Sequence, residues 1–308
     1  MTSTVEHEAP ACGVPSPTGA VLAEGAPVIE LGIPVTGGSH QRSTAGTAGL
    51  AVSDAERSEK FAQMRAGELG SLHSWELVTA VDGPGTRLTT FLAGCPLRCL
   101  YCHNPDTMEM RRGEPVLAEE LLRRIGRYQA VFEVTGGGLT ISGGEPLMQP
   151  AFVARVLRGA KELGVHTAID TSGYLGAHCS DAMLDDLDLV LLDVKSGIPE
   201  TYKKTTGRDL QPTLDFGRRV AASGTEIWVR FVLVPGLTDA PENVDAVADY
   251  VASLSTVSRV EVLPFHQMGR DKWQSLGMAY ELEDTEPPSP DLVARVRGQF
   301  RDRGLTVF

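Results

Sequence analysis

The chain has 308 residues, of which 42% are hydrophobic and 22% charged, and its formal net charge is -12. That charge argues against a nucleic-acid-binding protein, which needs a basic patch or stripe. No apolar run approaches the roughly 20 residues of a membrane-spanning helix. We therefore expect no nucleic-acid or membrane partner, and either one large domain or two smaller ones.

Residues 1–66 differ in composition from the rest of the chain. Prolines and glycines between Pro10 and Gly49 interrupt the apolar patterns of this part before any of them reaches the length of a helix or strand. We predict a disordered N-terminal extension over residues 1–66, followed by a core domain over residues 67–308. The extension lacks the basic and apolar regions of a secretory signal, and its acidic residues argue against a transit peptide. A cytoplasmic location is expected.

From residue 67 onward, short apolar runs alternate with segments of helical spacing. The expected strands are residues 87–93, 138–142, 165–169, 187–192, 227–234 and 257–263, and the clearest expected helices are residues 117–128 and 150–163. Such alternation favours an α/β fold with a parallel sheet and helical crossovers, and near-continuous apolar strands imply burial on both faces. About six units predict a partial (β/α)6 barrel with its chemistry at the carboxyl ends of the strands. An open doubly wound sheet is the alternative.

Three cysteines on one short loop, Cys95, Cys99 and Cys102, follow the first expected strand. In a cytosolic protein, clustered cysteines indicate metal binding or catalysis rather than a disulfide. A [4Fe-4S] cluster normally takes one thiolate per iron, so three thiolates would leave one iron open to an outside ligand. The alternative is a zinc site completed by His103. Cys12 and Cys179 are remote from the loop, and we interpret Cys179 as structural.

Glycines and carboxylates follow the next three expected strands. Gly143, Gly144 and Glu145 come directly after the second, where glycines let a ligand approach the backbone; an ordinary turn is the alternative. Asp170 and Asp193 end the third and fourth strands, where a buried carboxylate needs a partner or a cation. A helix cap is the alternative for Asp170.

The last two strands carry a cation and a histidine. Arg230 lies within the fifth strand, and a strand arginine among apolar neighbours needs an anionic partner. A ligand carboxylate and an internal salt bridge are both open at this point. His266 follows the sixth strand, where a lone histidine is more often structural than functional. Residues 82–85, Asp-Gly-Pro-Gly, form a strong turn signal.

Taken together, these motifs resemble the radical S-adenosylmethionine superfamily. The Cys-x3-Cys-x2-Cys loop, with Tyr101 before its last cysteine, and residues 142–145 carry that resemblance. A longer ordered set is similar to the glycyl-radical activases of the pyruvate formate-lyase activating family, and consists of residues 81–85, 101–104, 170–173, 192–195, 234–236 and 263–266. The cysteine-rich insertion of many other activases is absent between Asp106 and Gly137.

The resemblance implies a cofactor set and a ligand for each motif. It implies a [4Fe-4S] cluster on the three loop cysteines, S-adenosylmethionine beside it, and a monovalent cation. The implied cofactor contacts are Tyr101, Gly143, Gly144, Glu145, Asp170, Lys195, Arg230 and His266; the implied cation ligands are Asp170, Thr171 and Asp193; and the implied contacts with a substrate protein are Asp82 and His103.

The same resemblance implies the reaction and its partners. A 5'-deoxyadenosyl radical, made by reductive cleavage of S-adenosylmethionine, would take a hydrogen atom from a glycine of formate acetyltransferase under anaerobic conditions. A flavodoxin or ferredoxin would supply the electron, and the enzyme would be a cytoplasmic monomer. The alternatives are an activase of another glycyl-radical enzyme, a radical enzyme acting on a small molecule, and a non-enzymatic zinc-binding protein.

Overall fold

The computed structural model describes residues 48–79 and 81–308 of the chain. The chain divides into two compact units, residues 1–50 and 51–308. Among the described residues, all strands, and all helices apart from the first residues of α1, belong to the second unit. Within the described residues, no helix is long and apolar enough to cross a membrane.

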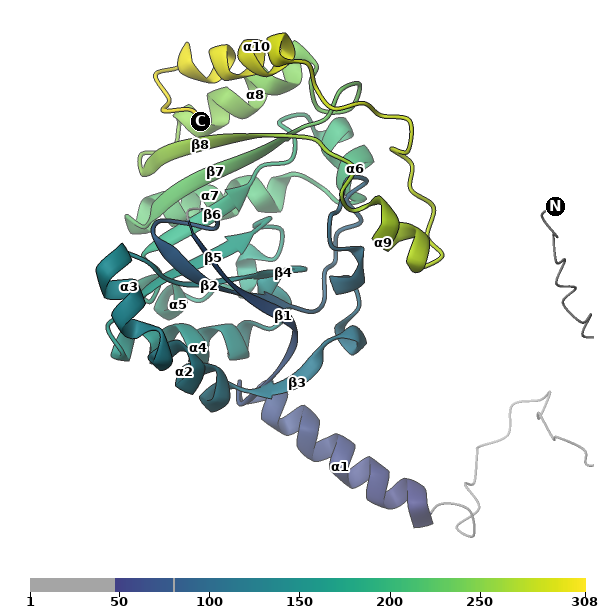
Figure 1. The fold of residues 1–308 in the computed structure, drawn as a ribbon, viewed down its shortest axis with the longest axis vertical. Helices are drawn as coiled ribbons and strands as arrows, with labels where there is room; N and C mark the ends of the chain where they lie inside the picture. Colours follow the sequence, from purple (N-terminus) through teal and green to yellow (C-terminus); the bar gives the residue numbers. More distant parts are fainter. Residues whose placement is uncertain (1–47, 80) are drawn as a thin grey trace, which may run out of the picture. The chain divides into compact units, whose positions relative to one another are not determined.

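The centre of the second unit is an eight-stranded sheet in the order β3-β1-β2-β4-β5-β6-β7-β8 (Figure 1). Its strands are β1 (Leu69–Thr79), β2 (Thr86–Leu92), β3 (Glu114–Leu117), β4 (Gly138–Gly143), β5 (His166–Thr171), β6 (Leu189–Asp193), β7 (Glu226–Leu233) and β8 (Val257–Pro264). The six strands from β2 through β4 to β8 pair in parallel. β1 is antiparallel to both β2 and β3.

This strand order confirms the expected partial barrel. Consecutive parallel strands are neighbours throughout, whereas a doubly wound sheet reverses its strand order at a switch point. No pairing joins β8 to β3 in the part of the chain that the structure describes, so the barrel is not closed by strand pairing there. The antiparallel strands β1 and β3 extend one edge beyond the six predicted units. β3, the edge strand, contains Pro115, which agrees with the confinement of proline to edge strands in sheets.

Helices connect the parallel strands, as the alternating pattern predicts. The α-helices are α1 (Ala48–Arg65), α2 (Ala118–Arg127), α3 (Gln129–Thr135), α4 (Pro150–Glu162), α5 (Asp181–Asp185), α6 (Pro199–Thr206), α7 (Gln211–Ser223), α8 (Pro241–Ala252), α9 (Arg270–Ser275) and α10 (Pro290–Arg301). Short 3-10 helices cover η2 (Pro105–Thr107), η3 (Met110–Arg112), η4 (Pro146–Met148) and η5 (Gly176–His178).

The N-terminal extension differs in part from the expectation. Residues 1–47, which include Cys12, lie outside the described residues. Residues 48–65, by contrast, form α1 rather than irregular chain. The correction has a simple cause, because no glycine or proline occurs between Leu50 and Arg65, and Ala, Glu, Lys, Gln and Arg in that stretch are good helix formers. The domain boundary after residue 66 stays a prediction.

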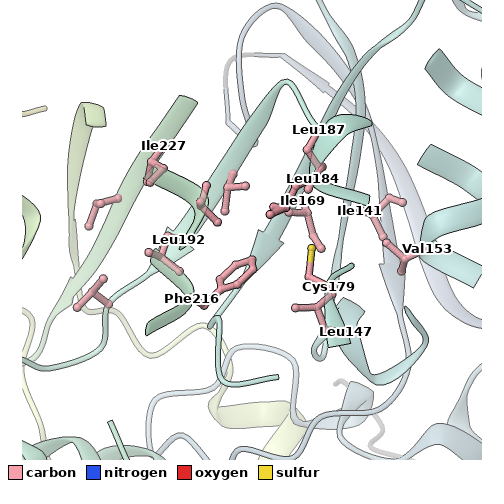
Figure 2. Close-up of a cluster of buried hydrophobic side chains, with 14 of the residues drawn as sticks. Ile141, Leu147, Val153, Ile169, Cys179, Leu184, Leu187, Leu192, Phe216 and Ile227 are labelled. Carbon is pink, nitrogen blue, oxygen red and sulfur yellow. The ribbon is translucent and has the colours of Figure 1, made fainter. Parts of the chain in front are cut away.

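The hydrophobic core lies between the sheet and the helices that follow its strands. Figure 2 shows Ile141 of β4, Ile169 of β5 and Ile227 of β7 in one layer with Val153 of α4 and Phe216 of α7. Cys179 is buried in the same layer, 1% exposed, as expected for a structural cysteine. Burial of this layer fixes the strands side by side, and so gathers the loops at their carboxyl ends.

Candidate active site

A cavity of about 510 Å³ opens among the loops at the carboxyl ends of the parallel strands. Its walls include all three loop cysteines and nearly all the other residues singled out in the sequence, namely Asp82, Tyr101, His103, Gly143, Gly144, Asp170, Thr171, Asp193, Lys195, Arg230 and His266. Residues remote in sequence thus converge on one hollow, as expected for the carboxyl end of a barrel.

The backbone of the cysteine loop is held by hydrogen bonds within the loop and to neighbouring segments. The amide of Cys95 donates to the carbonyl of Met108 at 3.0 Å, and the amide of Cys102 donates to the carbonyl of Cys99 at 3.1 Å. The indole Nε1 of Trp273, in α9, donates to the carbonyl of Cys102 at 2.8 Å. The three thiols form no disulfide. The loop is therefore shaped by its surroundings and leaves all three sulfurs available as ligands.

Burial makes these thiols poor thiolates unless a cation joins them. It raises the pKa of Cys95 and Cys99, and raises the pKa of Cys102 to about 12. The neighbouring ammonium of Lys195 opposes the shift at Cys99 but does not overcome it. A thiolate ligand needs compensation of this kind, and the iron of a cluster supplies it. The donor set, three thiols at the wall of one hollow, thus fits a [4Fe-4S] cluster.

The zinc alternative needs a fourth ligand beside the three thiols. His103, its fourth ligand, stacks on His266 with ring centroids 4.2 Å apart. Among the residues described, no group of three or more His, Cys, Asp and Glu side chains is arranged to hold a metal ion. A cubane cluster takes each thiolate on a different iron, so its ligands do not have to converge on one point.

Gly143, the last residue of β4, and Gly144 after it allow the end of β4 to lie close to the end of β2 and the start of the cysteine loop. Gly143 has φ +123, and a Cβ atom at this position would lie 2.2 Å from the backbone nitrogen of Leu92. A Cβ at Gly144 would lie 2.4 Å from the carbonyl oxygen of Gly94, directly before the cysteine loop. No larger residue fits here without moving backbone, so the two glycines set how closely the turn approaches the cysteine loop.

The side chain of Glu145, which the resemblance implies to be a cofactor contact, is buried behind the cavity wall. Its side chain is 1% exposed and does not line the cavity. One carboxylate oxygen accepts hydrogen bonds from the amide of Leu147 and the hydroxyl of Thr171, and the other accepts them from the amide and hydroxyl of Ser172. Glu145 therefore ties the turn after β4 to the turn after β5. Burial raises its pKa, against the effect of these hydrogen bonds.

Arg230 is surrounded by carboxylates. Its guanidinium lies 2.9 Å from Asp82, 3.1 Å from Asp170 and 3.3 Å from Glu261. Burial alone would lower the pKa of Arg230, but the charges of Asp170, Asp82 and Asp193 outweigh it and raise the pKa. Of the two readings left open by the sequence, the internal salt bridge is thus present, while Arg230 still lines the cavity.

Asp170 carries the clearest unfilled position in the site. Its Oδ2 accepts from the hydroxyl of Ser142 at 2.7 Å and faces Arg230, whereas its Oδ1 is buried without a hydrogen-bond partner. Burial raises the pKa of Asp170 to about 6, although Arg230 opposes the shift. A buried carboxylate oxygen without a partner is costly, which makes this oxygen a candidate for a bound cation or polar ligand.

Lys195 and Tyr101 line the cavity together with the three cysteines. The ammonium of Lys195 is 2.8 Å from Asp193 and 5.7 Å from the ring centroid of Tyr101. The hydroxyl of Tyr101 is buried without a partner. His103 directly follows Cys102, and burial and the neighbouring His266 lower its pKa.

Two functional neighbours, Glu261 and Trp273, escape the sequence reasoning, and Ser142 enters it only as part of the motif at residues 142–145. Ser142 and Glu261 bind the predicted residues Asp170 and Arg230, and Trp273 binds the last cysteine of the loop. Glu261 alone leaves a signal, as a carboxylate between Val260 and Val262 in a strand. Trp273 leaves none, because the chain returns to the cysteine loop only after β8.

Comparison with known proteins shows the family to which the chain belongs. Residues 89–248 match the model of the radical SAM superfamily. The chain is 44% identical over 218 residues to a pyruvate formate-lyase-activating enzyme of Clostridium pasteurianum, covering 71% of this chain and 91% of the relative. It is 36% identical over 242 residues to pyruvate formate-lyase 1-activating enzyme of Escherichia coli (strain K12), covering 78% of this chain and 98% of the relative.

The fold also has a counterpart among solved structures. A radical SAM methyltransferase from Sphaerobacter thermophilus superposes with a TM-score of 0.53 at 14% identity, covering 78% of this chain and 76% of that chain. At that level of identity the likeness concerns the fold alone.

Proposed function

Since the chain belongs to the radical SAM superfamily and, within it, to the pyruvate formate-lyase activating enzymes, we propose that it places a glycyl radical on formate acetyltransferase under anaerobic conditions. The observation that carries the proposal is the convergence of three free thiols and a ring of charged side chains on one cavity at the carboxyl ends of the strands. When bound there, a [4Fe-4S] cluster and S-adenosylmethionine supply one-electron cleavage of a carbon-sulfur bond and a 5'-deoxyadenosyl radical.

Cys95, Cys99 and Cys102 hold the cluster in this proposal. The support for this role is that all three thiols are free and line the same cavity. Three ligands from one loop leave the fourth iron for S-adenosylmethionine.

The cofactor contacts lie around the same cavity. Gly143 and Gly144 contribute backbone without side chains, and Tyr101 and His266 contribute aromatic side chains to the same lining. Lys195, Asp170 and Arg230 offer charge for the polar groups of the cofactor. Glu145 acts indirectly in our proposal, since its four hydrogen bonds fix the glycine turn from behind.

We assign the monovalent cation to Asp170, Thr171 and Asp193. Its main support is the buried Oδ1 of Asp170, which lacks a partner, next to a second carboxylate on the neighbouring strand end. A cation there would satisfy that oxygen and offset the burial of its charge.

The substrate protein would approach at the cavity wall formed by His103 and the turn at Asp82. The carboxylate of Asp82 is 2.9 Å from Arg230, and its carbonyl accepts from the hydroxyl of Thr140 at 2.7 Å. The turn is therefore braced against β4 and β7 and can meet a partner without folding inward. Seating a glycine loop here would also exclude water from a reactive radical.

We further propose flavodoxin or ferredoxin as electron donor, a monomeric enzyme and a cytoplasmic location. The anaerobic setting follows from the chemistry, because oxygen destroys both an exposed cluster and a glycyl radical.

The test is an anaerobic activation assay. The chain is reconstituted with iron and sulfide, reduced with photoreduced deazaflavin, and incubated with S-adenosylmethionine and formate acetyltransferase. Electron paramagnetic resonance should show a glycyl doublet, absent when the acceptor glycine of the partner is replaced by alanine. No doublet from a cluster-loaded enzyme, or a doublet only on another glycyl-radical enzyme, would contradict the proposal.

A further inference from the structure

Basic side chains gather where the C-terminal end of α6 meets the cysteine loop. Arg98, within the loop, is exposed, as are Lys203 and Lys204 in the last turn of α6 and Arg208 just beyond it. We call these four residues the basic face.

Direct contacts join the loop and the helix end into one surface. The amide of Arg98 donates to the carbonyl of Thr206 at 2.8 Å, and the Nε of Arg208 donates to the carbonyl of Pro96 at 2.8 Å. The guanidinium of Arg98 also donates to the carbonyl of Cys95 at 2.8 Å. The basic face is thus built onto the segment that carries the thiols.

The face has a sign opposite to that of the whole chain. The chain carries a formal charge of -12. The acidic side chains near the four basic ones include Asp209, just beyond the helix, and Glu109, whose charge interacts with that of Arg98, whereas Glu200 lies in the first turn of α6. Lys203 and Asp209 form a pair at 3.5 Å with side chains 69% and 76% exposed. Such an exposed pair is weak, so the face keeps an excess of positive charge.

The basic face also leaves the cavity free. Leu97, Cys99 and Tyr101 of the loop line the cavity, whereas none of the four basic residues does. A partner on the basic face would therefore reach the cysteine loop without occupying the wall at which a substrate protein is expected.

We infer that the basic face is the docking surface for an acidic one-electron carrier protein. The inference rests on the proposed function, which consumes one electron for each radical made. In the step, one electron passes from the reduced carrier to the cluster held by the loop, so the carrier is oxidised by one electron while no bond forms or breaks. Opposite surface charge raises the rate of such an encounter, and redox partners characteristically use small, transient interfaces.

The test compares two double variants of the reconstituted holoenzyme. Lys203→Glu/Lys204→Glu reverses the exposed basic pair on α6 and leaves Arg98 and the cysteines unchanged. Arg123→Glu/Arg127→Glu makes the same change of charge at exposed positions of α2. The probe is an acidic flavodoxin. Its Kd is measured in the oxidised form without S-adenosylmethionine, and its rate of cluster reduction is measured in the reduced form by stopped flow.

At low ionic strength, Lys203→Glu/Lys204→Glu should raise the Kd and slow cluster reduction by flavodoxin about tenfold or more. Added salt should shrink the difference, because it screens exposed charges. The α2 variant should stay within about twofold of the wild type, since its charges are remote from the encounter. Photoreduced deazaflavin should reduce all three proteins equally fast, because it needs no docking surface.

Equal Kd and rate in both double variants would overturn the inference. A matching loss with deazaflavin would also overturn it, because the substitutions would then act through the loop. So would a loss of affinity for formate acetyltransferase instead of flavodoxin. Failure of the deazaflavin-reduced wild type to cleave S-adenosylmethionine would instead contradict the proposed function, and the flavodoxin Kd is measured independently of that result.

Discussion

The replacement Glu145→Gln tests whether Glu145 positions the glycine turn. Its two carboxylate oxygens each accept from one backbone amide and one hydroxyl, those of Leu147 and Thr171 on one side and both groups of Ser172 on the other. A glutamine places an NH2 group against one of these sides. The hydroxyl there can rotate to accept, but the backbone amide cannot.

One buried N–H group is therefore left without an acceptor, which costs about 1–3 kcal/mol. For a domain of this size, each kcal/mol lowers the melting temperature by about 2–4 °C. We expect the Tm of Glu145→Gln to fall by about 2–12 °C. Because the turn approaches Gly94 directly before the cysteine loop, the KM for S-adenosylmethionine should rise more than kcat falls.

Scanning calorimetry and steady-state cleavage of S-adenosylmethionine measure the two effects. Glu114→Gln in the edge strand β3 is the matched control, since Glu114 is exposed and a surface change of this kind stays within about 0.5 kcal/mol. The reasoning is refuted if Glu145→Gln is as stable as the control variant.

Three other predictions concern single positions. Cys99→Ala should abolish cluster loading and cofactor cleavage. Cys179→Ala should keep both and lose about 0.5–1.5 kcal/mol of stability, as for one buried methyl-sized group. Normal iron content in Cys99→Ala, or loss of the cluster in Cys179→Ala, would show the ligand assignment to be wrong. Gly144→Ala should reduce iron binding, because its Cβ would meet a carbonyl oxygen at 2.4 Å; full iron content measured after reconstitution would contradict that. His166 accepts a hydrogen bond from the buried guanidinium of Arg87 at 3.0 Å, and burial and Arg87 lower its pKa from 6.5. Because the folded state therefore resists protonation of His166 more than the unfolded state does, the stability advantage of the wild type over His166→Gln should shrink as the pH falls through 6.5. Denaturant titrations measure this difference, and a difference that stays constant with pH would argue against the prediction.

The parallel part of the fold follows from local sequence signals. The predicted helix 150–163 is observed as Pro150–Glu162, with proline in its first turn and Gly164 at φ +71 just past its end. These are the residues that helix ends prefer. The antiparallel strands β1 and β3 were not predicted, because only the first four residues of β1 are fully buried and β3 has only four residues. Their pairing depends on contacts across about 45 residues of chain, which local periodicity does not encode.

The site was predictable where its signal was local. The cysteine spacing and the glycine pair indicate their chemistry directly. The expectation that chemistry lies at the carboxyl ends of the strands included Asp170 and Asp193, and both line the cavity. The partners of Arg230 were not predictable, because they depend on the register that sets Arg230 opposite Glu261 and on the turn that brings Asp82 across the sheet. The inward direction of Glu145 likewise depends on the hydroxyls of Thr171 and Ser172, which come from another strand end.

Iron and acid-labile sulfide analysis of the chain, purified and reconstituted without oxygen, tests the central claim most directly. We predict about four iron and four sulfide per chain, with S-adenosylmethionine changing the electron paramagnetic resonance spectrum of the reduced cluster by binding its open iron. A single zinc or iron per chain without sulfide, or a spectrum indifferent to S-adenosylmethionine, would contradict it.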